Sequence, residues 1–237
     1  MDGEQGLARA FVEFSDTLVG DYDVLDFLVR LCERSAEVLG VAAAGALLAD
    51  ARGRLGLVAA STEAVKVLES LQVQRREGPC VDAWRRGERV VVADLRGGAG
   101  TRWPVFTSRA LASGVVAVCA FPMRLRGERI GALNVFQTVP GGLDGAALDA
   151  GQALADVATI AILQARAVED AARLAGQLEQ ALASRVVIEQ AKGVLAERLG
   201  VDPDAAFTRL RRYARVHGLR LTGLARRVVD GSVTLEE

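Results

Sequence analysis

The sequence predicts an α+β protein in which an antiparallel sheet flanked by helices is followed by a long helix and a small three-helix domain. Three observations lead to this fold class. Helical and strand patterns alternate over the first part of the chain, with a hairpin near each end of that part. A long Ala-rich helical pattern follows, and short amphipathic segments separated by Gly end the chain. Hairpins favour antiparallel pairing over a doubly wound parallel sheet.

The first helical pattern covers residues 6–39, where apolar residues recur at helical spacing. Gly20-Asp21 interrupts the pattern, so we expect two helices. Asp21 or Asp23 is the expected cap of the second helix, and Gly40 fits the position just beyond its end.

The sheet elements follow from residue 41 onward. Residues 41–60 predict a β-hairpin, because two apolar runs flank a turn at 51–53. Capping residues and glycines mark the next boundaries. They predict a helix from Thr62, a helix from Gly78-Pro79 to Gly87, a strand at 90–92, a helix from Pro104 to Gly114, and two strands within 114–137 around the turn 126–128.

The Ala-rich run 144–182 predicts one long helix. The residues that would form the contact line of a coiled coil are spaced three or four positions apart, with one extra residue between Ala167 and Ala171. They are Ile160, Leu163, Ala167, Ala171, Leu174, Leu178, Ala181, Arg185 and Ile188. This heptad pattern with a stutter is typical of a two-chain coiled coil. We expect a parallel homodimer through residues 160–188; packing of the helix on its own domain is the alternative.

The last segment predicts three helices separated by glycines. The first ends at Gly200, the second runs from the cap Asp202 and Pro203 to Gly218, and the third runs from the cap Thr222 to Gly231. Residues 184–231 hold 10 basic and 5 acidic side chains, a net charge of +5. Residues 1–183 hold 19 basic and 23 acidic side chains, a net charge of −4. A basic module on an acidic body indicates a polyanionic partner.

Composition excludes several classes of protein. The 237 residues are 51% hydrophobic, enough for a sizeable core. The N-terminus lacks the pattern of a signal peptide, and no uninterrupted apolar run is long enough for a membrane span, so we expect a cytoplasmic protein with no membrane partner. Three isolated Cys and one His argue against a disulfide framework and a metal site.

Catalytic motifs are also missing from the sequence. There is no HExxH or GxSxG, and the Gly-rich stretch 97–100 is followed by Thr-Arg-Trp, so we interpret it as a flexible loop and not a phosphate loop. Cys80 lies at a predicted helix N-terminus, which can lower a thiol pKa. No His is near it in the sequence, so we expect a structural or pocket-lining residue, no catalytic residues, and a protein that is not an enzyme.

An ordered series of short motifs occupies most of residues 177–232. It comprises Ser184-Arg185, Ile188, Gln190-Ala191-Lys192-Gly193, Leu195, Ala206-Phe207, Leu210-Arg211, Ala214, Arg220-Leu221, Leu224-Ala225 and Val228-Val229. The series resembles an ANTAR domain, a three-helix RNA-binding module of bacterial antitermination regulators; Ala196 stands where that family often has Met. The resemblance implies a dimer that binds paired stem-loops in nascent leader RNA and prevents a terminator from forming.

A second series lies within residues 7–165. It comprises EGPCVDAW at 77–84, ADL at 93–95, WPVF at 103–106 and the long run at 114–136. It resembles a GAF domain, a sensor fold that often binds small molecules, although the fold leaves the ligand open. The chain as a whole resembles GAF-ANTAR regulators. We divide it into a GAF domain at 1–165, a helical linker at 166–183 and an ANTAR domain at 184–237.

Candidate ligand contacts in the GAF segment are Cys80, Trp84, Trp103 and Phe106. They would line a pocket for a small molecule of unknown identity, or they would fill the core. The sequence does not name the cofactor or signal.

Lys192 is one of only two Lys among 29 basic residues. The resemblance implies that Ala191, Lys192 and Gly193 face RNA. Gly193 would let the RNA approach the helix closely, Ala191 would keep the surface low, and Lys192 offers three rotatable donors. A solvated Lys beside a tolerated Gly is the alternative.

The other candidate RNA contacts are Arg185, Gln190, Arg211, Arg212, Tyr213, Arg215 and Arg220. The interpretation places Arg185 and Gln190 within about one helical turn of Lys192. Arginine side chains suit phosphates, which is the role expected of Arg211, Arg212, Arg215 and Arg220. The ring of Tyr213 can stack on a base. Solvated helix faces and partial burial of Tyr213 are the alternatives. Two other functions stay open at this point: a DNA-binding regulator, and a sensor that acts through protein contacts.

Overall fold

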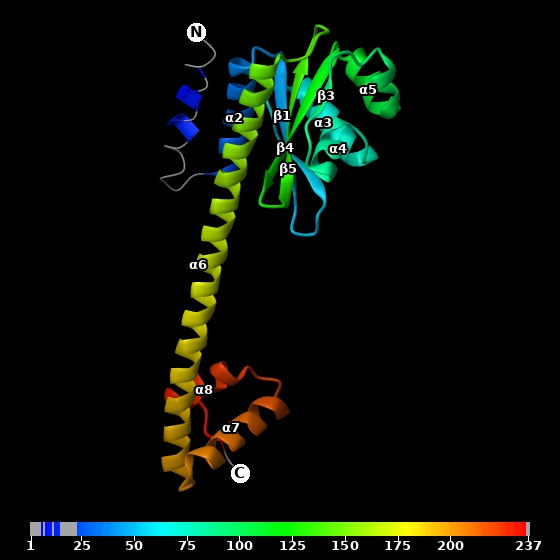
Figure 1. Cartoon of the computed structure of the whole chain (residues 1–237). Helices are drawn as coiled ribbons and strands as arrows, with labels where there is room; N and C mark the ends of the chain where they lie inside the picture. Colours follow the sequence, from blue (N-terminus) through cyan, green and yellow to red (C-terminus); the bar gives the residue numbers. More distant parts are fainter. Residues whose placement is uncertain (1–5, 7, 11, 15–22, 236–237) are drawn as a thin grey trace. The chain divides into compact units, whose positions relative to one another are not determined.

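The computed structural model describes residues 6, 8–10, 12–14 and 23–235 (Figure 1). The chain divides into two compact units, residues 1–166 and residues 167–237, called here the N-terminal unit and the C-terminal unit. Residues 8–10 and 12–14 are helical. The predicted break at Gly20-Asp21 lies outside the described residues.

The N-terminal unit contains the sheet. Its elements are α2 (Val24–Val38), β1 (Ala43–Ala49), β2 (Leu55–Ala60), α3 (Glu63–Arg75), α4 (Pro79–Arg86), β3 (Val90–Val92), α5 (Pro104–Ala112), β4 (Ala117–Leu125) and β5 (Glu128–Gln137), with α6 (Gly145–Leu199) beginning in this unit. The strand order is β2-β1-β5-β4-β3, and every pairing is antiparallel. The predicted α+β class with an antiparallel sheet is confirmed.

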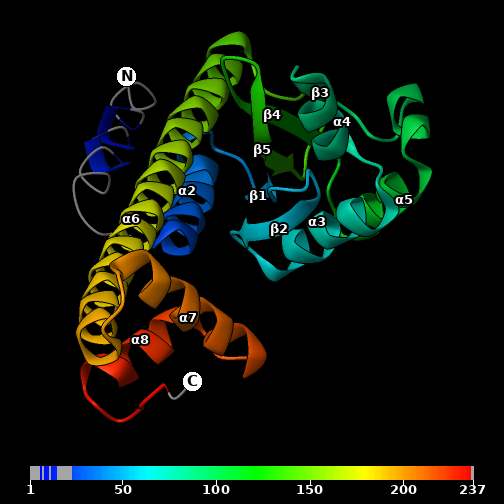
Figure 2. The same cartoon turned by 90° about the horizontal axis from the view of Figure 1, so that it is seen from below.

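Helices cover both faces of the sheet, because its strands alternate between two apolar cores. Figure 2 shows α2 and α6 on one face and α3, α4 and α5 on the other. In β1, Ala44, Ala46 and Leu48 join the core with α2 and α6, whereas Ala43 and Leu47 join the core with α3, α4 and α5. Strands buried on both faces explain why their sequences are apolar throughout.

Helix boundaries in this unit follow the predicted capping residues. The Asp23 carboxylate accepts from the backbone N–H of Leu25 at 2.7 Å, and Thr62 caps α3. Gly78 precedes Pro79 at the start of α4, and Gly87 ends that helix with a φ of 70°. One expectation was wrong: the Gly-rich stretch is not an irregular loop, because Gly98–Arg102 forms the 3-10 helix η1, with the Thr101 hydroxyl donating to the Gly98 carbonyl.

Helix α6 is a single helix from Gly145 to Leu199. It includes the predicted Ala-rich run and also the first predicted helix of the C-terminal segment. By length and composition, α6 is the one helix of the described residues that could cross a membrane, with a window of mean hydropathy 1.4. In the N-terminal unit this apolarity is used for packing, since Leu154, Ala158 and Ile162 are buried against the sheet.

The C-terminal unit adds α7 (Pro203–Val216) and α8 (Leu221–Val229). Asp202 caps α7, as predicted: its carboxylate accepts from the backbone N–H groups of Asp204 and Ala205, each at 2.9 Å. The predicted cap Thr222 was wrong. Helix α8 begins one residue earlier, at Leu221, and its cap position is Arg220, whose side chain makes no capping hydrogen bond.

Candidate nucleic-acid interface

The three helices of the C-terminal unit share one small apolar core. Its buried members are Ala191, Leu195, Ala206, Leu210, Ala214, Leu224, Ala225, Val228 and Leu235. The first two belong to α6, so the C-terminal end of this long helix is one of the three helices that form the core of this unit. Every other helix surface is free to carry polar and charged groups, and the basic side chains of the segment lie there.

Lys192 and Arg211 lie over the same aromatic ring. The Lys192 Nζ is 5.5 Å from the centre of the Phe207 ring, and the Arg211 guanidinium carbon is 5.6 Å from it. Cations at this distance are attracted by the negative face of an aromatic ring. Lys192 also donates to the Glu189 carboxylate at 2.9 Å, and only 17% of its side chain is exposed. The sequence therefore brings one lysine, one arginine and one phenylalanine from two helices into a compact basic patch, called here the Phe207 patch.

Arg185 lies on the same face of α6 as this patch. It precedes Lys192 by seven residues, which is about two helical turns, so the expected separation of one turn was wrong. Its side chain is exposed. Gly193 is exposed as well, and a methyl group placed on it would meet no other atom within 4 Å. Nothing in the folded chain itself requires Gly at this position.

Two predicted RNA contacts do not share this surface. Ala191 is fully buried in the core of the unit, so its role is packing and the expected contact with RNA was wrong. Gln190 is exposed, but it stands two positions from Lys192, so the two side chains leave the helix about 200° apart. Gln190 therefore cannot clamp the same phosphate or base as Lys192.

The remaining predicted contacts are distributed around α7 and α8. Arg212, Arg215 and Arg220 are exposed. Tyr213 is half-buried and stacks on His217 with 3.9 Å between the ring centres and 19° between the ring planes. One face of the Tyr213 ring is therefore already in contact with His217.

Most of the basic residues in this unit have no acidic partner. Within the part of the chain that the structure describes, no ion pair is formed by Arg185, Arg211, Arg212, Arg215 or Arg220. The carboxylate of Glu189 pairs with Lys192 alone. Unpaired guanidinium groups on a segment of net charge +5 are suited to bind phosphates.

The four predicted pocket residues of the N-terminal unit belong to one apolar core or pack against it. Cys80, Trp103 and Phe106 are buried in the core beneath α3, α4 and α5, and Trp84 packs at its edge. Burial raises the pKa of the Cys80 thiol well above its usual range, so the activation suggested by its helix N-terminus is wrong. These residues fill space, the alternative that the sequence left open.

Comparison with known families agrees with both halves of this description. The family model of the GAF domain matches residues 22–163, and that of the ANTAR domain matches residues 176–229. The chain belongs to the GAF domain family. Its architecture is GAF-ANTAR, as the sequence predicts, and both domains are regulatory.

Solved structures are similar to the GAF domain in fold. One is the GAF domain of an Acinetobacter phosphoenolpyruvate-protein phosphotransferase, 19% identical, with a TM-score of 0.54 over 69% of this chain and 94% of that chain. Its counterpart from Coxiella burnetii is also 19% identical, with a TM-score of 0.54 over 70% and 98%. A domain of a two-component sensor histidine kinase protein from Sinorhizobium meliloti 1021 is 18% identical, with a TM-score of 0.53 over 65% and 99%. Among curated protein sequences there is no match.

The GAF domain also contains a buried polar cluster that the sequence did not reveal. Glu69, Gln72 and Asn134 are each fully buried. Asn134 and Gln72 donate their side-chain amides to the two oxygens of Glu69, and the Gln72 carbonyl accepts from the backbone N–H of Cys80 at 3.0 Å. Burial raises the pKa of Glu69 to about 8, against the opposing effect of the two amide donors.

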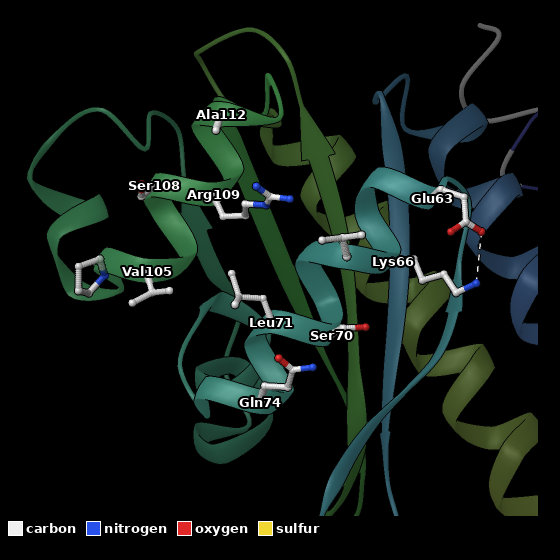
Figure 3. A pocket seen from close by; sticks show the side chains of 11 residues that line it. Glu63, Lys66, Ser70, Leu71, Gln74, Val105, Ser108, Arg109 and Ala112 are labelled. Atoms are coloured by element: carbon white, nitrogen blue, oxygen red, sulfur yellow. Dashed lines mark hydrogen bonds and ion pairs between the residues drawn. The ribbon is translucent and has the colours of Figure 1, made fainter.

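The GAF domain has a groove between α3 and α5, and none of the four predicted pocket residues lines it. Its volume is about 860 Å³. Figure 3 shows Glu63, Lys66, Ser70, Leu71 and Gln74 of α3 opposite Val105, Ser108, Arg109 and Ala112 of α5. On the α3 side, Lys66 forms an ion pair with Glu63 at 3.2 Å. On the α5 side, the groove has one basic side chain, Arg109 (Figure 3).

Proposed function

We propose that the protein is an RNA-binding transcription antitermination regulator and not an enzyme. The ANTAR domain would bind stem-loops in nascent leader RNA and prevent an overlapping terminator from forming, under the control of a signal received by the GAF domain. It would act in the cytoplasm, where nascent bacterial transcripts are made. The presence of an ANTAR domain at residues 176–229 supports the RNA part of this proposal.

The observation that carries the proposal is the Phe207 patch, together with the unpaired arginines elsewhere in the same unit. Lys192 and Arg211 flank one ring at 5.5 and 5.6 Å. A half-buried aromatic ring between two cations offers a stacking surface and phosphate contacts within one small area. Splayed bases in RNA loops are recognised by this combination of stacking and charge.

A second copy of the chain is the proposed partner of α6. Leu174, Leu178 and Leu182 are 56%, 57% and 65% exposed, and they lie within about one third of the helix circumference. The two ends of the predicted seam are already used inside the chain: Leu163 packs on the sheet core and Ile188 on the ANTAR core. We therefore place the contact between two copies in the central part of the expected 160–188 segment.

The test is binding of the full-length protein to a leader RNA with two stem-loops, each with a six-nucleotide loop. Lys192→Ala is compared with Lys66→Ala, which removes the other lysine of the chain from an exposed ion pair on α3. We expect Lys192→Ala to weaken binding about tenfold or more and Lys66→Ala to leave it unchanged. Raising the salt concentration should weaken wild-type binding, because phosphate contacts release counterions.

The same titration is repeated with a DNA version of the two stem-loops. Equal affinity for DNA and RNA would favour a DNA-binding regulator. No binding to either nucleic acid at low salt would contradict the proposal and favour a sensor that acts through protein contacts.

A further inference from the structure

A second basic site lies in the GAF domain. Four arginines border one hollow of about 600 Å³: Arg86 at the end of α4, Arg124 at the end of β4, Arg126 in the β4–β5 turn, and Arg129 at the start of β5. Gln152, Asp156 and Ile160 of α6 also line the hollow. With Asp156 as the one acidic side chain of the lining, its formal charge is +3.

The positive charge of this hollow is not neutralised by the protein. None of the four arginines forms an ion pair within the described ranges of the chain. The guanidinium of Arg129 donates to the backbone carbonyl of Arg85, which fixes its position without removing its charge. Asp156 already accepts a hydrogen bond from Gln152 at 2.9 Å.

Two placements of arginine here are unfavourable for folding. Arg124 and Arg129 are directly opposite each other on neighbouring antiparallel strands, where like charges repel. Both aliphatic stems lie close to Gly87: a methyl group on Gly87 would be 3.3 Å from the Cδ of Arg129 and 3.6 Å from that of Arg124. The two positive groups are therefore held near one another.

Arg126 has a backbone conformation that most side chains avoid. Its φ is 48°, and that of Gly127 is 90°. A two-residue hairpin turn with positive φ at both positions favours Asn-Gly or Asp-Gly, because Asn and Asp tolerate the left-handed region. Strained backbone of this kind clusters at functional sites.

We propose that this hollow binds the phosphate chain of a small molecule, either a nucleoside triphosphate or inorganic polyphosphate. Guanidinium groups bind phosphate oxygens through paired charge-assisted hydrogen bonds. The volume is that of a small-molecule site, and Leu125 and Ile160, 38% and 48% exposed, give a nucleoside apolar surface to contact. A bound polyanion would neutralise the repulsion between Arg124 and Arg129.

A small anion fits this hollow better than a nucleic-acid strand. Outside the hollow, the unit that contains it is acidic: residues 1–166 hold 18 basic and 20 acidic side chains, and without the four arginines and Asp156 of the hollow they hold 14 and 19. A long strand would have to pass over this acidic surface, whereas a phosphate chain stays within the hollow. The proposal does not rest on RNA binding by the ANTAR domain, since ligand binding is measured without RNA.

The experiment is calorimetric titration of the full-length protein with ATP, GTP, inorganic triphosphate and the nucleosides adenosine and guanosine. We expect saturable binding of at least one triphosphate and at least about a hundredfold loss when the phosphates are removed. Equal affinity for inorganic triphosphate and nucleotide assigns the site to polyphosphate; a clear preference for one nucleotide assigns it to a nucleoside triphosphate. No saturable binding at millimolar ligand would overturn the proposal.

Two variants separate a binding role from a structural one. Arg124→Gln and Arg126→Asn should each weaken triphosphate binding about tenfold, whereas Arg52→Gln, an exposed arginine in the turn of the other hairpin, should not change it. Arg126→Asn should also raise the melting temperature by about 2 °C, because Asn tolerates the left-handed region better. Binding that survives both substitutions, or RNA that competes for the hollow more strongly than any triphosphate, would contradict the site.

Discussion

Asn134 on β5 donates its side-chain amide to the Glu69 carboxyl on α3 over 2.5 Å, and both side chains are fully buried. The other polar atom of the Asn134 side chain, Oδ1, is buried and has no hydrogen-bond partner among the residues that the structure describes. Gly45 and Gly78 make room for the cluster, since a methyl group on Gly45 would be 2.8 Å from Glu69 and one on Gly78 would be 2.2 Å from Gln72. The core of the GAF domain thus contains a buried carboxyl group, that of Glu69, whose ionised form is disfavoured by burial.

The stability of the GAF domain should decrease as the pH rises from about 5 to about 8. The pKa of Glu69 is raised to about 8 in the folded state, and it is about 4.3 in an unfolded chain. Between these values the unfolded state is ionised while the folded state keeps its proton, so a rising pH favours unfolding. The stabilising contribution is complete below the unfolded pKa and is lost by the time the pH reaches the folded pKa.

Glu69→Gln is the variant that tests this dependence. It should raise the melting temperature at pH 8 and flatten the curve of melting temperature against pH. Glu63→Gln is the matched control, because Glu63 is an exposed residue of the same helix paired with Lys66. The single histidine, His217, lies in the other unit. A wild-type domain equally stable at pH 5 and pH 8 would contradict the assignment.

Gly193→Ala should stabilise the ANTAR domain and weaken its RNA binding. Ala is favoured over Gly inside a helix by about 1 kcal/mol, and the added methyl group meets open space. If RNA approaches the helix at Gly193, the same methyl group should lower the affinity about tenfold. Gly176→Ala is the control, since Gly176 is also an exposed α6 glycine with open space around it. Equal RNA affinities of the two variants would exclude close approach at Gly193.

Phe207→Leu should weaken RNA binding with little change in stability. It keeps an apolar side chain at this half-buried position but removes the ring that attracts Lys192 and Arg211. Each cation–π contact at such a site is worth about 0.5–1 kcal/mol. Loss of both contacts should therefore weaken RNA binding by about fivefold to thirtyfold. Phe207→Tyr keeps the ring face and should restore binding to within about twofold. Equal loss in both variants would argue against a role for the ring face.

Leu178→Asp should dissociate the proposed dimer. The substitution places a charge in the middle of the exposed apolar stripe of α6, where two copies would meet. Gln180→Asp adds the same charge about 200° around the helix and should leave association unchanged. Sedimentation equilibrium at several concentrations measures both variants. A wild-type protein that stays monomeric at high concentration would rule out the dimer.

The sheet and its boundaries could be predicted because they depend on local signals. Gly87, Asp23 and Thr62 act within a few residues of their own positions, and the structure places them as expected. Glu69 could not be predicted in the same way. The buried face of α3 carries Val65, Leu68, Glu69 and Gln72, two apolar and two polar residues, so apolar periodicity does not identify it. Its burial depends on partners 65 residues away in the chain.

The candidate RNA surface was predicted in part. The sequence identified Lys192 but treated its neighbours along the chain as neighbours in space. Helical phase alone separates Gln190 from Lys192, and the position of Ala191 four residues before Leu195 already indicates a buried face. The role of Phe207 could not be predicted, because the cations near its ring come from two different helices, which only the tertiary structure brings together.

The alignment of side chains along α6 limits the insertions and deletions that this helix can accept. Leu178, Arg185 and Lys192 follow one another at intervals of seven, so the leucine stripe and the basic face lie along one line of the helix. Deleting or inserting a single residue between Leu178 and Arg185 would turn one of them away from the other by about 100°. Insertions of seven or eleven residues would nearly restore the alignment. Chimeras that join this ANTAR domain to another helical sensor should therefore work only at linker lengths that keep the leucine stripe and the basic face in line.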